Sequence, residues 1–199
     1  MTQKSYSLPG EQFFKDHPLN ELSTGMMLYI SATAPELREK AIEVSDSMAP
    51  MGLQLPDNSE YVEKLKNETD LKKLLRMMRN YLPLEATTLM MEKLNARKTE
   101  AVPEIENILL KAFNSSTIEN CTLFLAQCPS DCSDWIRENY NQVRDDYARS
   151  RLCVVLGLKG DLQDVPFFVE QMEYFKIRCP ETDYAQAPLV ALYHLKKNQ

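Results

Sequence analysis

Equivalent apolar residues return along this chain every 31 or 32 residues, and this internal repeat restricts the fold more than any other feature of the sequence. One apolar column is Leu74, Ile105, Ile136 and Phe168. Four residues later stand Met78, Leu109, Tyr140 and Met172, and three residues after these stand Tyr81, Ala112, Val143 and Phe175. Two further columns precede them, namely Leu94, Leu125 and Leu156, and Met90, Cys121 and Leu152. Such self-similarity indicates stacked units of one supersecondary type.

Within each unit the apolar residues recur at intervals of three and four, which predicts short amphipathic helices. The predicted helices span 35–49, 59–67, 69–81, 84–96, 103–113, 116–127, 132–143, 146–157, 164–175 and 183–196. Five glycines in 199 residues argue against a β-rich chain and against a phosphate-cradling glycine loop. Pro103 and Pro166 fall where the first turn of a helix tolerates proline. The sequence therefore predicts an all-α protein.

Two segments resemble the HEAT repeat. In LGLKGDLQDVPFFVEQM, from Leu156 to Met172, a helix ends in Leu-Gly, a Gly-Asp turn follows, and Val-Pro opens the next helix. LNARKTEAVPEIENIL, from Leu94 to Leu109, is similar, whereas the middle unit has CPSDCSDWI in place of the turn and Val-Pro. The resemblance covers roughly residues 57–196. It implies a right-handed α–α superhelix of about four to five helix pairs, and it implies little about activity, because such repeats occur in scaffolds, adaptors, bilin lyases and one class of DNA glycosylase.

The domain organisation follows from these patterns. We expect residues 35–199 to form a single HEAT-like repeat domain. Residues 1–34, which contain Pro9-Gly10 and Pro18, are predicted to form an irregular N-terminal arm packed on the first helices.

Composition indicates a cytoplasmic protein. No apolar run has the length of a signal peptide or a membrane span. The five cysteines are an odd number, and four of them lie in or beside apolar helical patterns, which favours reduced thiols. The net charge of −6 argues against nonspecific binding to nucleic acid or anionic lipid. Only residues 60–100 carry a net positive charge, with nine Lys and Arg against seven Asp and Glu.

The resemblance implies that the second helix of each pair lines a concave face, and the register then identifies its outward side chains. The first rung is Lys73, Glu104, Trp135 and Phe167, the second is Arg76, Asn107, Glu138 and Glu170, and the third is Asn80, Lys111, Gln142 and Tyr174. Asn139 and Gln171 lie between the rungs. Because aromatic residues on a polar face are typical anchors, we predict a partner-binding site from Trp135 to Tyr174. The alternative is that Trp135 covers a seam between repeats, with its indole N–H bonded to a carbonyl.

A second candidate site is basic. Lys72, Arg76 and Arg79 follow helical spacing and, together with Lys73, could bind phosphate; Lys93, Arg97 and Lys98 lie nearby in the sequence. The alternative is an ordinary solvated helix face, and Asp70, Glu92 and Glu100 dilute the positive charge.

No motif for catalysis, metal or cofactor stands out. Cys128 and Cys132 lack the second ligand pair of a structural zinc site, and neither His17 nor His194 lies in a nucleophile or metal motif. Asp134 beside Trp135 resembles the acid-plus-aromatic arrangement of the repeat-type glycosylases, although the acidic net charge argues against that activity.

Three functions remain open at this point. The first is a non-catalytic scaffold or adaptor that binds a protein or peptide on the concave face, without a cofactor, metal or membrane. The second is a nucleic-acid-directed protein, including a base-excision enzyme of the alkylpurine glycosylase type. The third is a regulatory protein that binds a small ligand between repeats, which ligand-dependent thermal stabilisation would reveal.

Overall fold

The computed structural model describes residues 6–31 and 59–198, and in these residues it contains eleven α-helices, three short 3-10 helices and no strand. The prediction of an all-α protein is confirmed for this part of the chain, whereas the helix predicted at 35–49 lies outside the described residues. The N-terminal helices are α1 (Glu11–Asp16) and α2 (Thr24–Ile30). The rest are α4 (Ser59–Asn67), α5 (Leu71–Met77), α6 (Leu84–Ala96), α7 (Lys98–Leu109), α8 (Ser115–Gln127), α9 (Ser133–Asn139), α10 (Asp146–Lys159), α11 (Val165–Arg178) and α12 (Gln186–Lys197).

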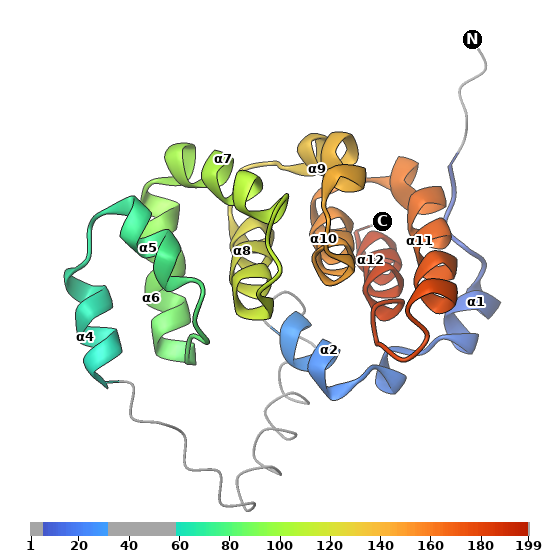
Figure 1. Cartoon of the computed structure of the whole chain (residues 1–199). Coiled ribbons are helices and arrows are strands. Elements are labelled where there is room, and N and C mark those ends of the chain that lie inside the picture. Colours follow the sequence, from blue (N-terminus) through green and yellow to red (C-terminus); the bar gives the residue numbers. More distant parts are fainter. Residues whose placement is uncertain (1–5, 32–58, 199) are drawn as a thin grey trace, which may run out of the picture.

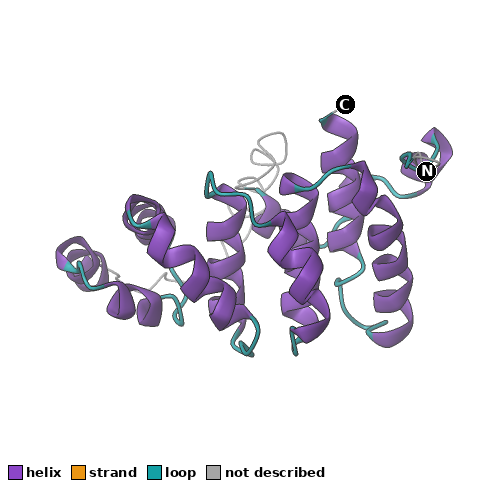
Figure 2. Cartoon of the chain, turned by 90° about the horizontal axis from the view of Figure 1, so that it is seen from above, coloured by secondary structure: helices purple, strands orange, loops and turns teal. Residues whose placement is uncertain are grey.

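The helices from α4 to α12 follow one another along an elongated molecule (Figure 1). Helices α6, α8, α10 and α12 form one row in which each packs on the next. Of the second row, α5 packs on α6, α7 lies against both α6 and α8, α9 packs on α10, and α11 packs on α12. The two rows are also visible from above (Figure 2). Each helix therefore buries its apolar stripe against the helices packed around it, which short amphipathic helices need for stability.

The inward register predicted from the repeat is confirmed by burial at all but one position. Ile105, Ile136 and Phe168 are 0% exposed, and the corresponding residues of the other columns are also buried. Tyr81 is the exception, because it is 71% exposed. Helix α5 ends at Met77 rather than at residue 81, so the register is lost in the following turn and Leu82 takes the inward place.

One proline prediction is correct and the other is wrong. Pro166 lies in the first turn of α11, as predicted. Pro103, in contrast, lies inside α7, which begins at Lys98 and is separated from α6 only by Arg97. Pro103 is exposed, whereas Ala101 and Ile105 are buried on the opposite side of the helix.

Helix α10 lies at the centre of the molecule, between α8 and α12. Residues 150–157 are all buried, so this helix has neighbours on every side. A Cβ atom added at Gly157 would lie 2.4 Å from the Cα atom of Ala191 in α12. The close approach of these two helices thus requires glycine at this position.

The described part of the N-terminal arm packs on the middle and last helices, whereas we predicted that it packs on the first helices. The backbone N–H of Ser23 donates to Gln186 Oε1 at 2.9 Å, and its hydroxyl donates to Asp183 Oδ2 at 2.5 Å. The hydroxyl of Tyr193 donates to the backbone carbonyl of Phe14 at 2.9 Å. Figure 1 shows α1 at the end of the molecule that holds α11 and α12. The arm is also not wholly irregular, since α1 and α2 lie within it.

A buried arginine fixes helix α2 to the core. Arg151 of α10 is 2% exposed, and its guanidinium carbon lies 4.4 Å from the ring centre of Tyr29 and 4.6 Å from that of Tyr147. The hydroxyl of Tyr29 donates to Thr122 Oγ1 at 2.7 Å. Cation–π contacts between two rings therefore compensate part of the cost of burying this charge, and one of the rings comes from the N-terminal arm.

All five cysteines are free, and four of them are buried. Burial raises the pKa of Cys121, Cys132 and Cys153 to about 12, so at pH 8 almost no reactive thiolate forms at these positions. We expect Ellman's reagent to label only Cys179 rapidly in the native protein, and all five thiols in denaturing guanidinium chloride. Rapid labelling of several thiols under native conditions would contradict the burial.

Candidate functional site

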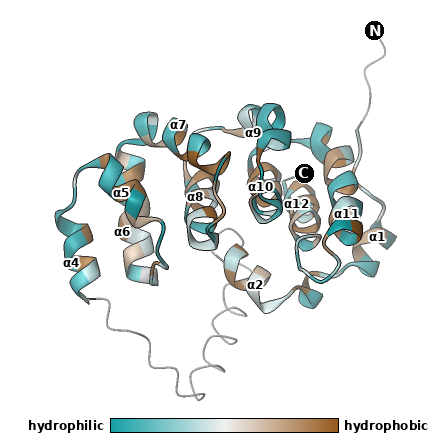
Figure 3. Ribbon diagram, viewed as in Figure 1, coloured by the Kyte–Doolittle hydropathy of each residue, from teal (hydrophilic) through white to brown (hydrophobic). Residues whose placement is uncertain are grey.

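Helices α5, α7, α9 and α11 carry both hydrophilic and hydrophobic residues (Figure 3), and most of their exposed residues are polar, although Val169 and Ile177 of α11 are exposed too. On their outward side, Glu138, Gln142 and Glu170 are exposed, whereas the inward residues Ile136 and Val143 are buried. We refer to this side of the four helices as the outer face. Its composition is the one predicted from the register.

The aromatic residues predicted as anchors are half-buried in the structure. Trp135, Phe167 and Tyr174 all pack against the apolar core while keeping part of their surface in solvent. The ring of Phe167 meets that of Tyr140 edge-on, with the ring centres 4.8 Å apart. Among the described residues the indole N–H of Trp135 has no acceptor, so the hydrogen bond proposed for a purely covering role is not formed there.

Several polar residues predicted for the same site bond within the protein. Gln171 accepts a hydrogen bond from the hydroxyl of Tyr140 at 2.9 Å, and the amide of Asn139 donates to the carbonyl of Trp135 at 3.0 Å. Gln142 donates to Asn139 Oδ1 at 2.9 Å. A partner at this part of the outer face would therefore have to compete with bonds that already exist.

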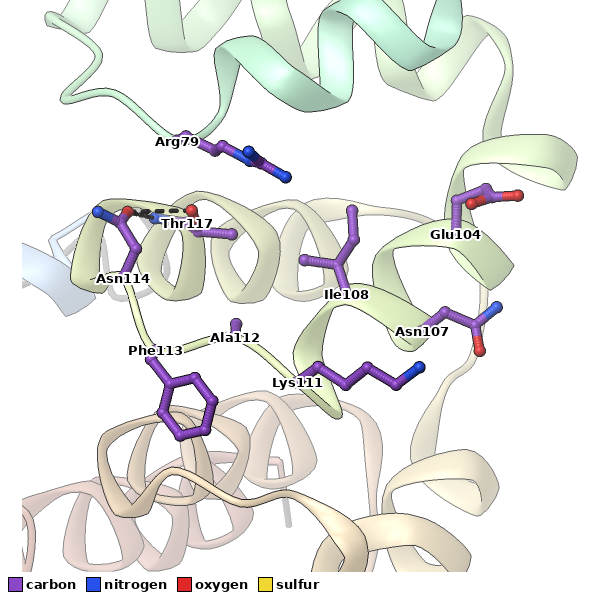
Figure 4. A pocket seen from close by; sticks show the side chains of 9 residues that line it. All are labelled: Arg79, Glu104, Asn107, Ile108, Lys111, Ala112, Phe113, Asn114 and Thr117. Carbon is purple, nitrogen blue, oxygen red and sulfur yellow. Dashed lines mark hydrogen bonds between the residues drawn. The ribbon is translucent and has the colours of Figure 1, made fainter.

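A groove opens instead between α5 and α7. It consists of a cleft of ≈ 560 Å³ and an adjoining cleft of ≈ 240 Å³, which share four lining residues: Arg79, Glu104, Ile108 and Thr117. In Figure 4, Arg79 reaches over the gap toward α7, from which Glu104, Asn107 and Ile108 project. We call this the α5–α7 groove.

Four cations line the α5–α7 groove. They are Lys72, Arg76, Arg79 and Lys111, which are exposed and whose side chains make no hydrogen bond or ion pair with any described residue. Three of them belong to the predicted basic stripe, and the structure adds Lys111 from the next unit. Glu104 is the carboxylate among the lining residues.

The remaining basic residues near this segment are used internally. Lys73 Nζ lies 3.6 Å from Glu68 Oε2, Lys93 donates to the carbonyl of Lys66 at 2.9 Å, and Arg97 pairs with Glu100 at 2.7 Å. Of the four predicted phosphate-binding residues, Lys73 is thus separated from Lys72, Arg76 and Arg79. Sequence spacing did not indicate this, because Glu68 lies in the loop before α5.

The turn that carries Arg79 is held firmly in place. The buried amide of Asn120, in α8, donates to the carbonyls of Met78 and Asn80 at 2.9 and 3.1 Å. The hydroxyl of Tyr61, in α4, donates to the carbonyl of Met77 at 2.9 Å. These bonds satisfy the carbonyls at the end of α5, so the backbone at Arg79 is fixed before any ligand arrives.

A separate cleft lies on the other side of the molecule, where α2, α6 and α8 meet. Its volume is ≈ 770 Å³, and its lining includes Leu28 and Tyr81, which are 43% and 71% exposed. Sequence reasoning missed this cleft, because the periodicity assigned Tyr81 to the core and gave no position for α2.

The features that suggested other chemistry are not assembled into a site. Asp134 is 88% exposed in its side chain and pairs with Arg137 at 2.7 Å. No group of three or more potential metal ligands occurs in residues 6–31 and 59–198, and no helix of that part is long and apolar enough to cross a bilayer. Comparison with protein-family models, curated proteins and solved structures gives no match to this chain.

Proposed function

We propose that this chain is a HEAT-like repeat protein, a right-handed α–α superhelix that acts as a non-catalytic scaffold or adaptor. It binds another protein through the outer face, which the HEAT resemblance implies to be the concave face of the repeats. The observation that carries the proposal is the division of α5, α7, α9 and α11 into two sides. The inward register is buried except at Tyr81, whereas the second outward rung, Arg76, Asn107, Glu138 and Glu170, is polar and exposed. Stacked helix pairs present such extended surfaces to partners, and the surfaces need no catalytic group.

The test compares two triple variants that carry the same change in charge. The outer-face variant is Asn107→Arg, Glu138→Arg and Glu170→Arg, and all three positions are exposed. The control is Glu85→Arg, Glu92→Arg and Gln127→Arg on α6 and α8, where all three positions are also exposed. Immobilised proteins are incubated with lysate of the source cells, and captured proteins are quantified by mass spectrometry.

We expect the outer-face variant to lose about tenfold or more of its captured partner, because three arginines on one rung disturb both shape and charge complementarity. The control should capture as much as the unmodified protein. Loss of the partner from the control alone would place binding on the other row of helices and contradict the proposal. Failure of the unmodified protein to capture any partner would contradict it as well.

A further inference from the structure

The α5–α7 groove combines positive charge with an apolar surface. Lys72, Arg76, Arg79 and Lys111 surround it, and Ile108 and Phe113 contribute apolar area. Phe113 is 66% exposed, an unusual position for a phenylalanine, and it also lines the next cleft toward α10. An exposed ring beside unpaired cations is typical of a surface that a partner covers.

We infer that the α5–α7 groove binds an acidic segment of a partner protein, whose carboxylates pair with Lys72, Arg76, Arg79 and Lys111 and whose apolar side chain packs on Phe113. The inference rests on the proposed function and specifies which kind of partner segment binds at one end of the outer face. Charge complementarity is its basis, because these cations have no counter-ion among the described residues. The continuous groove formed by the two clefts suits an extended chain.

The groove fits a peptide better than a nucleic acid. Glu104 lines both clefts, and its carboxylate can accept a hydrogen bond from a backbone N–H, a donor that a peptide backbone supplies and the sugar-phosphate backbone of DNA lacks. Asn107 lines the larger cleft with an amide that can both donate to and accept from a peptide backbone. A nucleic-acid strand that continued along the outer face would next meet the exposed Glu138 and Glu170. Because the positive charge is confined to the groove and carboxylates follow it along the outer face, the surface matches an acidic segment of only a few residues.

Asn120 and Tyr61 hold the turn that carries Arg79, so this part of the groove is ordered before a ligand binds. A fixed backbone reduces the conformational entropy that binding must remove. The four long cationic side chains still lose rotamer freedom on binding, whereas the backbone that carries Arg79 is already ordered.

The experiment is a selection of random twelve-residue peptides displayed on phage against the unmodified full chain, followed by affinity measurements by fluorescence anisotropy. We expect enrichment of Asp and Glu together with Leu, Phe or Trp. The Arg76→Glu, Arg79→Glu variant should bind the selected peptides at least about tenfold more weakly, and added salt should weaken binding to the unmodified protein. Phe113→Ala should also weaken binding, by about fivefold or more, with the salt dependence retained.

The matched control is Lys64→Glu, Arg178→Glu, which makes the same charge change at two exposed cations in α4 and at the end of α11. It should bind the selected peptides like the unmodified protein. Thermal melts followed by circular dichroism verify that all variants fold. If the Arg76→Glu, Arg79→Glu variant does not fold, Lys111→Glu replaces it, because Lys111 is exposed and lines the same groove.

Selected peptides without acidic enrichment, or equal binding by both double variants, would overturn the inference. A twelve-nucleotide single-stranded DNA that binds more tightly than the best peptide, and that loses affinity in the Arg76→Glu, Arg79→Glu variant, would also overturn it and assign the groove to nucleic acid. The proposed function is tested separately. If the Arg76→Glu, Arg79→Glu variant still captures the lysate partner that the outer-face variant loses, the inference about the groove fails and the proposed function stands.

Discussion

Replacement of Leu156 by alanine is expected to lower the free energy of unfolding by about 2–5 kcal/mol. Leu156 is 1% exposed and lies in the stretch of α10 that is buried on all sides. Truncation removes apolar contacts and leaves a cavity, and α12 cannot close it easily because it already packs closely on α10, with Ala191 against Gly157.

A urea melt measures this loss, and Leu158→Ala serves as the control. Leu158 belongs to the same helix but is only half-buried, so its truncation should cost about 1 kcal/mol. A loss below about half a kcal/mol for Leu156→Ala would contradict the packing derived from the repeat, because it would imply that the site is not part of a tightly packed core.

The second large effect concerns a buried carboxylate. Asp164 is 4% exposed, and its two oxygens accept hydrogen bonds from Arg137 Nε and Nη2, each at 2.9 Å. It also accepts from the backbone N–H of Asp161 at 3.0 Å and thereby closes the capping box before α11. The hydrogen bonds to Asp164 raise the pKa of Arg137, so the arginine remains charged. Removal of the carboxylate would leave that charge without its buried partner.

We expect Asp164→Ala to lower the free energy of unfolding by about 3 kcal/mol. Asp134→Ala is a strict control, because Asp134 pairs with the same arginine but its side chain is 88% exposed. An exposed pair contributes at most about 1 kcal/mol, so this variant should change stability little. Equal effects of the two substitutions in urea melts would show that burial does not determine the contribution of this ion pair.

Much of the helical architecture could be predicted from the sequence. Ile136, Tyr140 and Val143 were expected to face inward while Glu138 and Gln142 faced outward, and burial confirms this. The reason is local, since a helix places residues three and four apart on one side. Helix ends were less predictable: α9 stops at Asn139 and continues as the 3-10 turn Tyr140–Gln142 without disturbing the burial of Tyr140 and Val143.

The candidate site was only partly accessible to sequence reasoning. Helical spacing placed Lys72, Arg76 and Arg79 on one stripe, but it could not place Lys111 across the groove from them. That juxtaposition depends on the distance between α5 and α7, which the packing of both helices on α6 determines. Spacing also could not separate Lys73 from the stripe, because its pairing with Glu68 depends on the path of a loop.

From α4 onward the sequence by itself determined where helices form, to within a few residues, and which side of each one is buried, because the 3.6-residue turn and the apolar repeat are properties of the local chain. Only the tertiary structure decided that the N-terminal arm covers the last helices and that Arg151 is buried between Tyr29 and Tyr147. These contacts join segments far apart in the sequence, so they depend on the shape and charge of surfaces that exist only after the helices have packed.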